Sequence, residues 1–304
     1  MRLVPRTHRL LRVLYYFNLA TSTTTTRLSA KKYIMHLVFD FDGTITQQDT
    51  IGVLANSAIE YQKQHHDKDL QSEWDQVVEG YVTDYRRYSL DHPMPAEERK
   101  CIKDEISFLS GSKDVEETSL ERVAASEVFK GMDADKLKRA GQEAVRTGKV
   151  KIRAGFAELM DLANDRGWPV GVVSVNWSRA FIEGALLPHE LRVVANEPHA
   201  DGSIEGPEFL GGRMTNGHEK RAALDHVVAD RGCRVVYFGD STTDMECLLQ
   251  GGIVISDDEG SSLMRTLRRV GEAVPHVGER EAGERLMWAR DFREVLESGV
   301  LEEE

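Results

Sequence analysis

From residue 153 onward the chain alternates between short apolar runs and longer segments of helical periodicity, and this alternation limits the possible folds more than any other feature. The apolar runs span residues 169–174, 192–196, 234–239 and 252–256. Apolar residues at helical spacing mark the segments 155–167, 178–187, 218–232 and 243–250. Buried strands that alternate with helices form βαβ units with right-handed crossovers. The pattern therefore predicts a parallel sheet with helices on both faces.

One further strand is expected much earlier, at residues 36–39, and it leads directly into the sequence Asp-Phe-Asp-Gly-Thr. Between Asp49 and about Val150 no convincing strand pattern occurs. Helices are expected there instead, at residues 50–66, 72–90, 95–110, 115–130 and 133–148. Because this segment interrupts the sheet after its first strand, we expect it to cover the carboxyl edge, where open α/β sheets bind ligands.

Together these patterns predict an α/β fold with a parallel sheet core and a helical cap domain. The core is expected to comprise residues 35–48 and 151–304, and the cap domain residues 49–150. No run of about 18 apolar residues occurs, so no membrane span is expected. The three cysteines lie far apart without a CxxC pair, which argues against a disulfide framework and a zinc site.

The first 34 residues differ from the rest in composition. They hold seven of the 39 Lys and Arg residues, no Asp or Glu, and a Ser/Thr-rich stretch, as mitochondrial presequences do. Alternatively they are an over-long start, because Met35 directly precedes the first predicted strand. Under either interpretation residues 1–34 lie outside the fold. The protein is expected in the cytoplasm unless this segment targets it to mitochondria.

The other residues carry 32 Lys and Arg against 51 Asp and Glu. A surface this acidic repels a phosphate backbone, so a nucleic acid is not an expected partner. The balance fits an enzyme for a small ligand that gathers its few cations in one site. The sequence leaves the oligomeric state open.

Asp40 and Asp42 follow the first predicted strand and are separated by one residue. Such a pair alone is common on surfaces and at helix starts. Here an apolar strand leads into it, and Gly43 and Thr44 allow a sharp turn after it. Two carboxylates at one sheet edge repel each other, and a divalent cation relieves the repulsion. The pair therefore indicates a Mg²⁺ site, where the ion would also neutralise phosphoryl oxygens.

A second acidic loop follows the 234–239 run, with Asp240 at the strand tip and Asp244 four residues later. Taken alone, this loop is a helix start capped by Asp. Taken with the first loop, its strand tip supplies another carboxylate to the metal. Oxygen ligands from two loops suit Mg²⁺ better than a softer metal.

Two further positions suit a phosphoryl group. Ser174 ends the 169–174 run, and its hydroxyl and the backbone N–H groups that follow, on Val175 and Asn176, can bind a phosphoryl oxygen at a helix start. The alternative is that Ser174 caps the helix. Lys220 lies early in an amphipathic helix, where a lysine is usually solvated, so its assignment depends on its place in the order of motifs.

The order acidic loop, serine, lysine, second acidic loop resembles the four motifs of the haloacid dehalogenase-like phosphatase superfamily, over residues 36–256. The resemblance implies an α/β fold with a doubly wound parallel (Rossmann-like) sheet core and a helical cap domain, Mg²⁺ and a phospho-aspartyl intermediate. The helical insert after the first motif resembles the cap of the phosphoserine phosphatase-like branch. That branch usually has Ser-Gly-Gly at its second motif. This chain has Ser174-Val175-Asn176-Trp177, which argues against phosphoserine itself as the substrate.

The resemblance also implies a role for each motif residue. Asp40 would be the nucleophile and Asp42 the general acid and base. The metal would bind Asp40, Asp240 and the backbone carbonyl of Asp42, with Asp244 in a supporting role. The phosphoryl group would be bound by Ser174, Val175, Asn176, Lys220, Gly43 and Thr44.

We therefore expect Mg²⁺-dependent hydrolysis of a small phosphorylated metabolite. A phosphomutase or phosphotransferase would share Asp40 and Asp42, and a non-catalytic phospho-ligand-binding protein is the alternative from another class. Substrate choice is expected to depend on the cap domain. Asp49 either caps the first cap helix or faces the pocket, and Trp177 either packs against the cap or stacks on a substrate ring. Tyrosines at helical spacing are expected in the cap interior rather than in a substrate site: Tyr81, Tyr85 and Tyr88.

Overall fold

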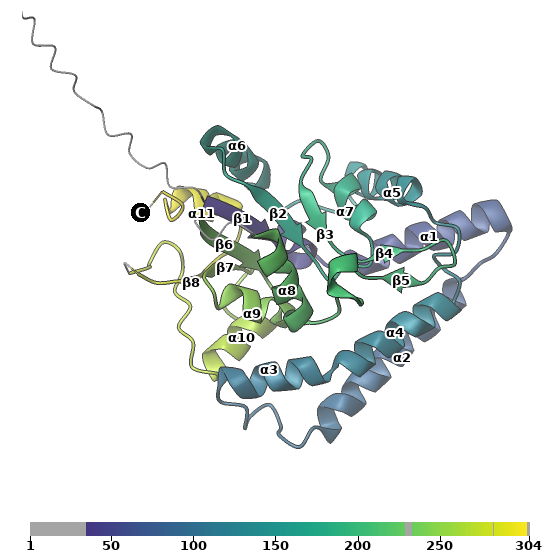
Figure 1. Ribbon diagram of the computed structural model, residues 1–304, viewed down its shortest axis with the longest axis horizontal. Coiled ribbons are helices and arrows are strands. Elements are labelled where there is room, and N and C mark those ends of the chain that lie inside the picture. Colours follow the sequence, from purple (N-terminus) through teal and green to yellow (C-terminus); the bar gives the residue numbers. More distant parts are fainter. Residues whose placement is uncertain (1–34, 229–232, 282, 303–304) are drawn as a thin grey trace, which may run out of the picture. The chain divides into compact units, whose positions relative to one another are not determined.

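The computed structural model describes residues 35–228, 233–281 and 283–302 (Figure 1). The proposed presequence at residues 1–34 lies outside the described residues. Within the described ranges, no helix combines the length and the apolar character needed to cross a bilayer. The described residues all fall in one compact unit, so the division into core and cap domains stays a proposal.

A six-stranded parallel sheet forms the centre of the fold, in the strand order β3-β2-β1-β6-β7-β8. Its strands are β1 (Met35–Phe39), β2 (Val170–Val173), β3 (Arg192–Val194), β6 (Arg234–Gly239), β7 (Gly252–Ile255) and β8 (Leu286–Ala289). The first five were predicted within two residues at each end. The strand β8 was not predicted, and its four residues follow β7 after α10 (Ser262–Arg269).

Successive residues of a strand face opposite sides of the sheet, and both sides of this sheet are apolar. On one side Leu37, Phe39 and Phe238 pack against α6 (Phe156–Arg166), α7 (Arg179–Ala185) and α11 (Phe292–Glu297). On the other side Val38 and Tyr237 pack against α8 (Gly217–Val227), α9 (Met245–Leu248) and α10 (Ser262–Arg269). Helices therefore cover both faces, and the predicted α/β doubly wound sheet is confirmed.

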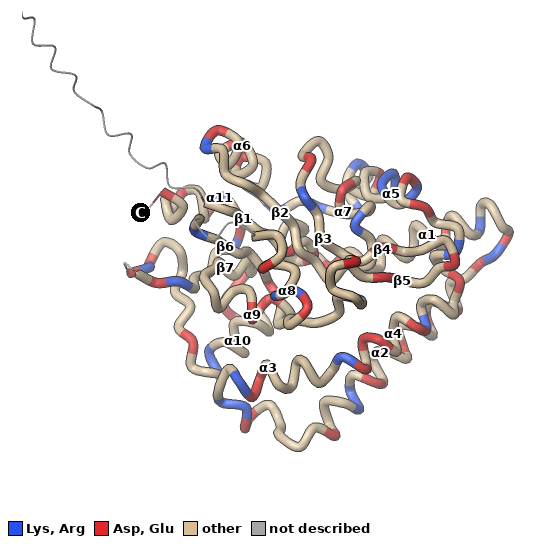
Figure 2. Tube along the Cα trace, viewed as in Figure 1, with Lys and Arg blue, Asp and Glu red and all other residues tan. Residues whose placement is uncertain are grey.

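Five helices lie between β1 and α6 in the chain: α1 (Ile51–His66), α2 (Gln71–Asp91), α3 (Ile102–Gly111), α4 (Lys113–Ala125) and α5 (Ala134–Arg146). The helices α2 and α4 run side by side, with acidic and basic residues interspersed along them (Figure 2). The prediction that the third helix starts at residue 95 is wrong. Residues 95–99 form tight turns instead, because Arg99 folds back and donates to Glu105 and to the Met94 carbonyl.

The chain leaves and re-enters the sheet through two segments that pair with each other. Thr46 and Ile152 form an antiparallel bridge. The N–H of Gln47 donates to the Lys151 carbonyl at 2.9 Å, and that of Arg153 donates to the Ile45 carbonyl at 2.8 Å. The start and end of the helical segment therefore meet next to the loop that carries Asp42.

Candidate active site

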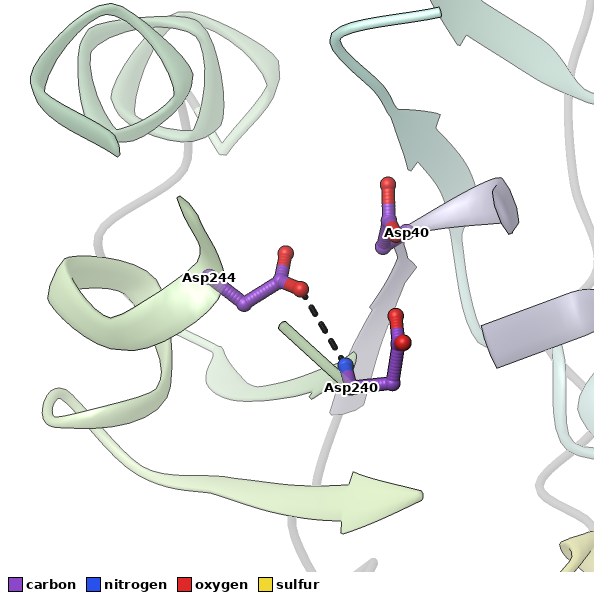
Figure 3. A group of neighbouring side chains, drawn as sticks. All are labelled: Asp40, Asp240 and Asp244. Carbon is purple, nitrogen blue, oxygen red and sulfur yellow. Dashed lines mark hydrogen bonds between the residues drawn. The ribbon is translucent and has the colours of Figure 1, made fainter. Parts of the chain in front are cut away.

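The strand register brings the two acidic loops together. Leu37 of β1 pairs with Val236 of β6, and Phe39 pairs with Phe238. Asp40 and Asp240 therefore follow the tips of neighbouring parallel strands, and the Asp40 N–H donates to the Phe238 carbonyl at 2.8 Å. The carboxylates of Asp40, Asp240 and Asp244 each offer an oxygen within 4.8 Å of the others (Figure 3). The predicted meeting of the two acidic loops is observed.

Lys220 contacts two carboxylates of this acidic cluster, and none of its side chain is exposed. Its Nζ is 2.7 Å from Asp40 Oδ1 and 2.6 Å from Asp244 Oδ1. The helix start that places it is fixed by a capping box between Asn216 and Glu219. Burial alone would lower the pKa of Lys220, but Asp244 and Asp40 outweigh burial and raise it, so the ammonium stays charged.

Asp244 has no free oxygen for another ligand. Its Oδ1 accepts from Tyr237 and pairs with Lys220, while its Oδ2 accepts from the N–H groups of Asp240 and Ser241 and from the Ser241 hydroxyl. A carboxylate in this position holds the loop and the lysine in place. That geometry favours the predicted supporting role over direct metal binding.

The loop after Asp40 depends on a glycine. Gly43 has a φ of +73°, and a Cβ at this position would lie 2.2 Å from Asp240 Oδ2. The N–H of Gly43 donates to the Thr46 hydroxyl, and the Thr44 hydroxyl donates to Asp240 Oδ1 at 3.1 Å. Two groups that were predicted to bind phosphate are therefore engaged within the protein.

The carboxylates at the tips of β1 and β6 repel one another, so a bound cation would stabilise them. Burial raises the pKa of Asp40 well above its usual value, with repulsion from Asp244 and Asp240 adding to the shift against the opposing effect of Lys220. Burial, followed by repulsion from Asp244, raises the pKa of Asp240 to about 7. One lysine lies among three carboxylates here, two of them buried and that of Asp240 half-buried, and hard oxygen ligands suit Mg²⁺. The donor set therefore fits this ion, with Asp40 and Asp240 as the carboxylates able to hold it.

The side chain of Asp42 points away from that cluster. Its Oδ1 accepts from the N–H and the hydroxyl of Thr50 at 2.7 and 2.6 Å, and its Oδ2 accepts from Asn176 Nδ2 at 2.7 Å. Burial, with repulsion from Asp49 next, raises its pKa to about 6 despite these donors. A carboxyl with this pKa can give and take a proton near neutral pH.

The second motif supplies one free hydroxyl. Ser174 is 1% exposed, accepts from the Asn176 N–H at 3.2 Å and lines the cavity above Asp40. The Asn176 side chain donates to Asp42 and Thr50 and so orients the acid group, and Asn176 also lines the cavity. Ser178 is the residue that caps α7, since its hydroxyl accepts from Phe181. Ser174 therefore remains available to a ligand.

A cavity of about 560 Å³ opens over Asp40 and extends to the helical segment. Trp177 lines it and packs edge-on against Trp74 at 5.9 Å. Asp49 lies at its rim, and its Oδ1 also accepts from the Ile51 N–H at 2.9 Å. Asp49 thus lines the pocket, while the N-cap residue of α1 is Thr50 rather than Asp49. A larger cavity of about 870 Å³ borders the opposite ends of β6 and β7, away from Asp40.

Three residues of the site were not anticipated. Tyr237 donates to Asp244, Thr50 donates to Asp42, and the Arg153 guanidinium donates to the carbonyls of Gly43 and Thr44 at 2.7 and 3.1 Å. A tyrosine in a buried strand next to an acidic tip is a usable signal, because its hydroxyl needs a partner. Thr50 and Arg153 carry no such signal, since their partners are set by the course of the loops.

Comparisons with known proteins give two curated relatives. The CTO1 family protein C17G9.12c of Schizosaccharomyces pombe is 29% identical over 237 residues, which cover 70% of this chain and 78% of that protein. Cold tolerance protein 1 of Saccharomyces cerevisiae is 23% identical over 260 residues, which cover 74% of this chain and 80% of that protein.

Similar solved structures include one described as a phospho-aspartyl intermediate analogue of phosphoserine phosphatase. It has a TM-score of 0.49, 17% identity, and coverage of 88% of this chain and 99% of that chain. A phosphoserine phosphohydrolase-like protein from Francisella tularensis subsp. tularensis SCHU S4 has a TM-score of 0.47, 14% identity, and coverage of 87% and 99%.

The family model of haloacid dehalogenase-like hydrolases matches residues 37–249. This span starts within β1, includes both acidic loops and the buried lysine, and covers more than half of the chain. The chain therefore belongs to the haloacid dehalogenase-like hydrolase family.

Proposed function

We propose that this protein hydrolyses small phosphate monoesters, with Asp40 as the nucleophile. The observation that carries the proposal is the environment of the Asp40 carboxylate. Lys220 holds Oδ1, whereas Oδ2 has no hydrogen-bond partner among the described residues, and the carboxylate lines the cavity. A carboxylate fixed by one oxygen and exposed to a ligand by the other is suited to attack phosphorus in line.

The chemistry would proceed in two displacements. In the first, Asp40 Oδ2 forms a bond to phosphorus while the bond to the ester oxygen breaks, and Asp42 gives its proton to that oxygen. In the second, Asp42 takes a proton from water, whose oxygen attacks phosphorus and releases phosphate from Asp40. The pKa of Asp42 of about 6 supports both of its roles. Lys220 stabilises the negative charge beside Asp40, and the Ser174 hydroxyl can donate to a phosphoryl oxygen.

Asp40, Asp240 and the backbone carbonyl of Asp42 are the proposed holders of Mg²⁺. When bound, the ion supplies charge neutralisation and orientation of the phosphoryl oxygens. The Gly43 backbone keeps the space beside Asp240 open. Asp244 stabilises this arrangement through its bonds to Lys220 and to the N–H of Asp240.

Phosphate release from a panel of monoesters tests the proposal. We expect Mg²⁺-dependent release by the natural protein and inhibition by beryllofluoride, which mimics a phosphoryl group on aspartate. Asp40→Asn should abolish turnover because an amide is a poor nucleophile, while Asp161→Asn, at an exposed position on α6, serves as the matched control. Substantial turnover by Asp40→Asn, or full activity in EDTA, would contradict the mechanism.

The same assay separates the alternatives. A phosphomutase returns the phosphoryl group to an alcohol, so it forms an isomeric phosphate ester and releases little inorganic phosphate. A non-catalytic phospho-ligand-binding protein binds esters without either product.

A further inference from the structure

One wall of the cavity that Asp40 lines comes from two helices of the segment between β1 and α6. From α2, Trp74, Val77 and Tyr81 line it, at the spacing that places side chains on one helix face. From α4, Glu116 and Ser119 line it, three residues apart on one face. In a phosphatase this wall would surround the organic part of the ester. The expectation that Tyr81 lies only in the helical interior is therefore incomplete.

Glu116 presents a carboxylate to the cavity without a cationic partner among the described residues. Tyr81 donates to its Oε1 at 3.0 Å and so fixes its orientation, while Oε2 accepts from no described residue. Burial raises the pKa of Glu116, against the opposing effect of the Tyr81 hydrogen bond. A ligand that carries a positive charge would therefore relieve an unfavourable desolvation of the carboxylate.

Ser119 is an independent indication of a polar ligand. Its side chain is buried, with 4% of the residue exposed, and it lines the cavity. No described residue hydrogen-bonds to its hydroxyl, and this oxygen is not among the buried atoms without a partner, so it is accessible to a ligand in the cavity. Because α4 places this hydroxyl one turn from Glu116, both oxygens can accept N–H groups from one ligand atom.

The charges around the cavity limit the ligand further. Among the described residues that line it, none is Lys, Arg or His, and Asp49 adds a carboxylate at the rim. The rings of Trp74, Trp177 and Tyr81 add faces that attract cations. An ester with a carboxylate on its organic part would meet like charge and no counter-ion.

We propose that the substrates are phosphate monoesters of amino alcohols, whose protonated amine binds between Glu116 and Ser119. The inference rests on the proposed phosphatase function and adds the substrate class. The phosphoryl group would lie at Asp40 and the ammonium group at α4. Amino acid phosphates, which carry an added carboxylate, would be disfavoured.

Matched pairs of esters test the inference: ω-aminoalkyl phosphates with two to five carbons, each against the n-alkyl phosphate in which a methyl group replaces the ammonium. At the chain length with the highest activity, kcat/KM for the aminoalkyl phosphate should exceed that for the matched n-alkyl phosphate by roughly 10- to 100-fold, because charge-assisted hydrogen bonds have this strength. Choline phosphate separates charge from hydrogen bonding, because it has the charge without N–H groups, and it should rank below the best amino ester. Phosphoserine should also rank below it.

Two substitutions, Glu116→Gln and Ser119→Ala, test whether the preference for amino esters depends on these two residues of the cavity wall. In Glu116→Gln the amide keeps the shape of the side chain and can still accept from Tyr81. The ratio of kcat/KM between the amino ester and its n-alkyl counterpart should therefore fall to about threefold or less. Glu121→Gln, at an exposed position on the same helix, should keep the full preference. Ser119→Ala should reduce the difference in kcat/KM between the amino ester and choline phosphate, because it removes a group that accepts from an N–H of the ammonium.

A binding measurement keeps this inference separate from the proposed function. Asp40→Asn protein, which should not hydrolyse the esters, can be titrated with each of them while tryptophan fluorescence is followed, because Trp74 and Trp177 line the cavity. Tighter binding of the amino ester supports the inference even if no ester is hydrolysed, an outcome that would overturn only the phosphatase proposal. Equal binding of each pair, no binding of any ester, or a preference that survives Glu116→Gln would overturn the inference.

Discussion

Gly43 lies so close to Asp240 that no side chain fits between them: a Cβ on Gly43 would be 2.2 Å from Asp240 Oδ2 and 2.6 Å from Cγ. The close approach joins the loop after β1 to the tip of β6, and the Thr44 hydroxyl reinforces it by donating to the same carboxylate. The position of the second acidic loop relative to Asp40 thus depends on the absence of one methyl group.

Gly43→Ala should therefore weaken Mg²⁺ binding and lower kcat. The new Cβ would displace the Asp240 carboxylate, and a positive φ would add strain of about 1 kcal/mol or more. The Mg²⁺ concentration for half-maximal activity should rise by about 10-fold or more, since one ligand moves. Gly148→Ala is a matched control, because Gly148 has a φ of +75° and no atom within 4 Å of its Cβ position. If both variants show the same loss of activity, backbone strain and not contact with Asp240 is the cause.

Arg153→Lys should lower kcat with a smaller change in KM. Arg153 is 8% exposed, and its fork donates to the carbonyls of Gly43, Thr44 and Arg290. A lysine keeps the charge but cannot reproduce the planar fork, so the loop should lose its fixed position. Misplacement of this kind costs about 10- to 100-fold in rate.

The control for this variant is Asp257→Asn. It removes the ion pair of Arg153 with an 85% exposed carboxylate and should change kcat little, because exposed pairs contribute at most about 1 kcal/mol. Kinetics at saturating Mg²⁺, with a melting curve for each variant, check the prediction. A normal kcat for Arg153→Lys in folded protein would show that the carbonyl contacts do not position the site.

Asp49→Asn should leave the fold and the rate at optimal pH nearly unchanged, because an Asn oxygen can still accept from the Ile51 N–H. Asp49→Ala should destabilise the protein by about 0.5–1.5 kcal/mol through loss of that hydrogen bond. The charge of Asp49 raises the pKa of Asp42, so its removal should shift the Asp42 limb of the pH–rate profile to lower pH. A profile that does not move would mean that the two carboxylates do not interact.

The parts of the fold that depend on periodicity could be predicted from the sequence. Apolar strands that lead into Asp40 and Asp240 had to end at the same sheet edge, because parallel strands share their carboxyl edge. The order of the motifs was enough to direct attention to Lys220, although a lysine on an amphipathic helix is usually solvated. Its burial follows from packing of α8 against the sheet, which periodicity alone does not reveal.

What could not be predicted depends on the rotation and crossing of helices. Helices were expected at both α2 and α4, but nothing in the sequence places Glu116 in the same cavity as Asp40. Hydrogen-bond partners show the same limit. The backbone N–H of Asn176 was expected at the phosphate, but nothing in the sequence indicated that its side chain donates to Asp42 and Thr50.

The stability of the metal-free protein should fall as pH rises from 6 to 8. Asp240 and Asp42 have pKa values of about 7 and about 6 in the fold, above the ordinary value of 3.8. In this pH range the folded state therefore holds protons that the unfolded state has lost, so the free energy of unfolding decreases as those protons leave. The loss should be roughly 1–2 kcal/mol over the two pH units.

Urea denaturation in EDTA at several pH values measures this dependence. Asp240→Asn removes one of the two titrating groups and should flatten the curve, whereas Asp225→Asn, at an exposed position on α8, should not. Saturating Mg²⁺ should also abolish the fall, because a bound cation favours the ionised carboxylates and offsets their repulsion. A metal-free protein whose stability does not change between pH 6 and pH 8 would show that these carboxylates are already ionised at pH 6 and that Lys220 alone balances the cluster.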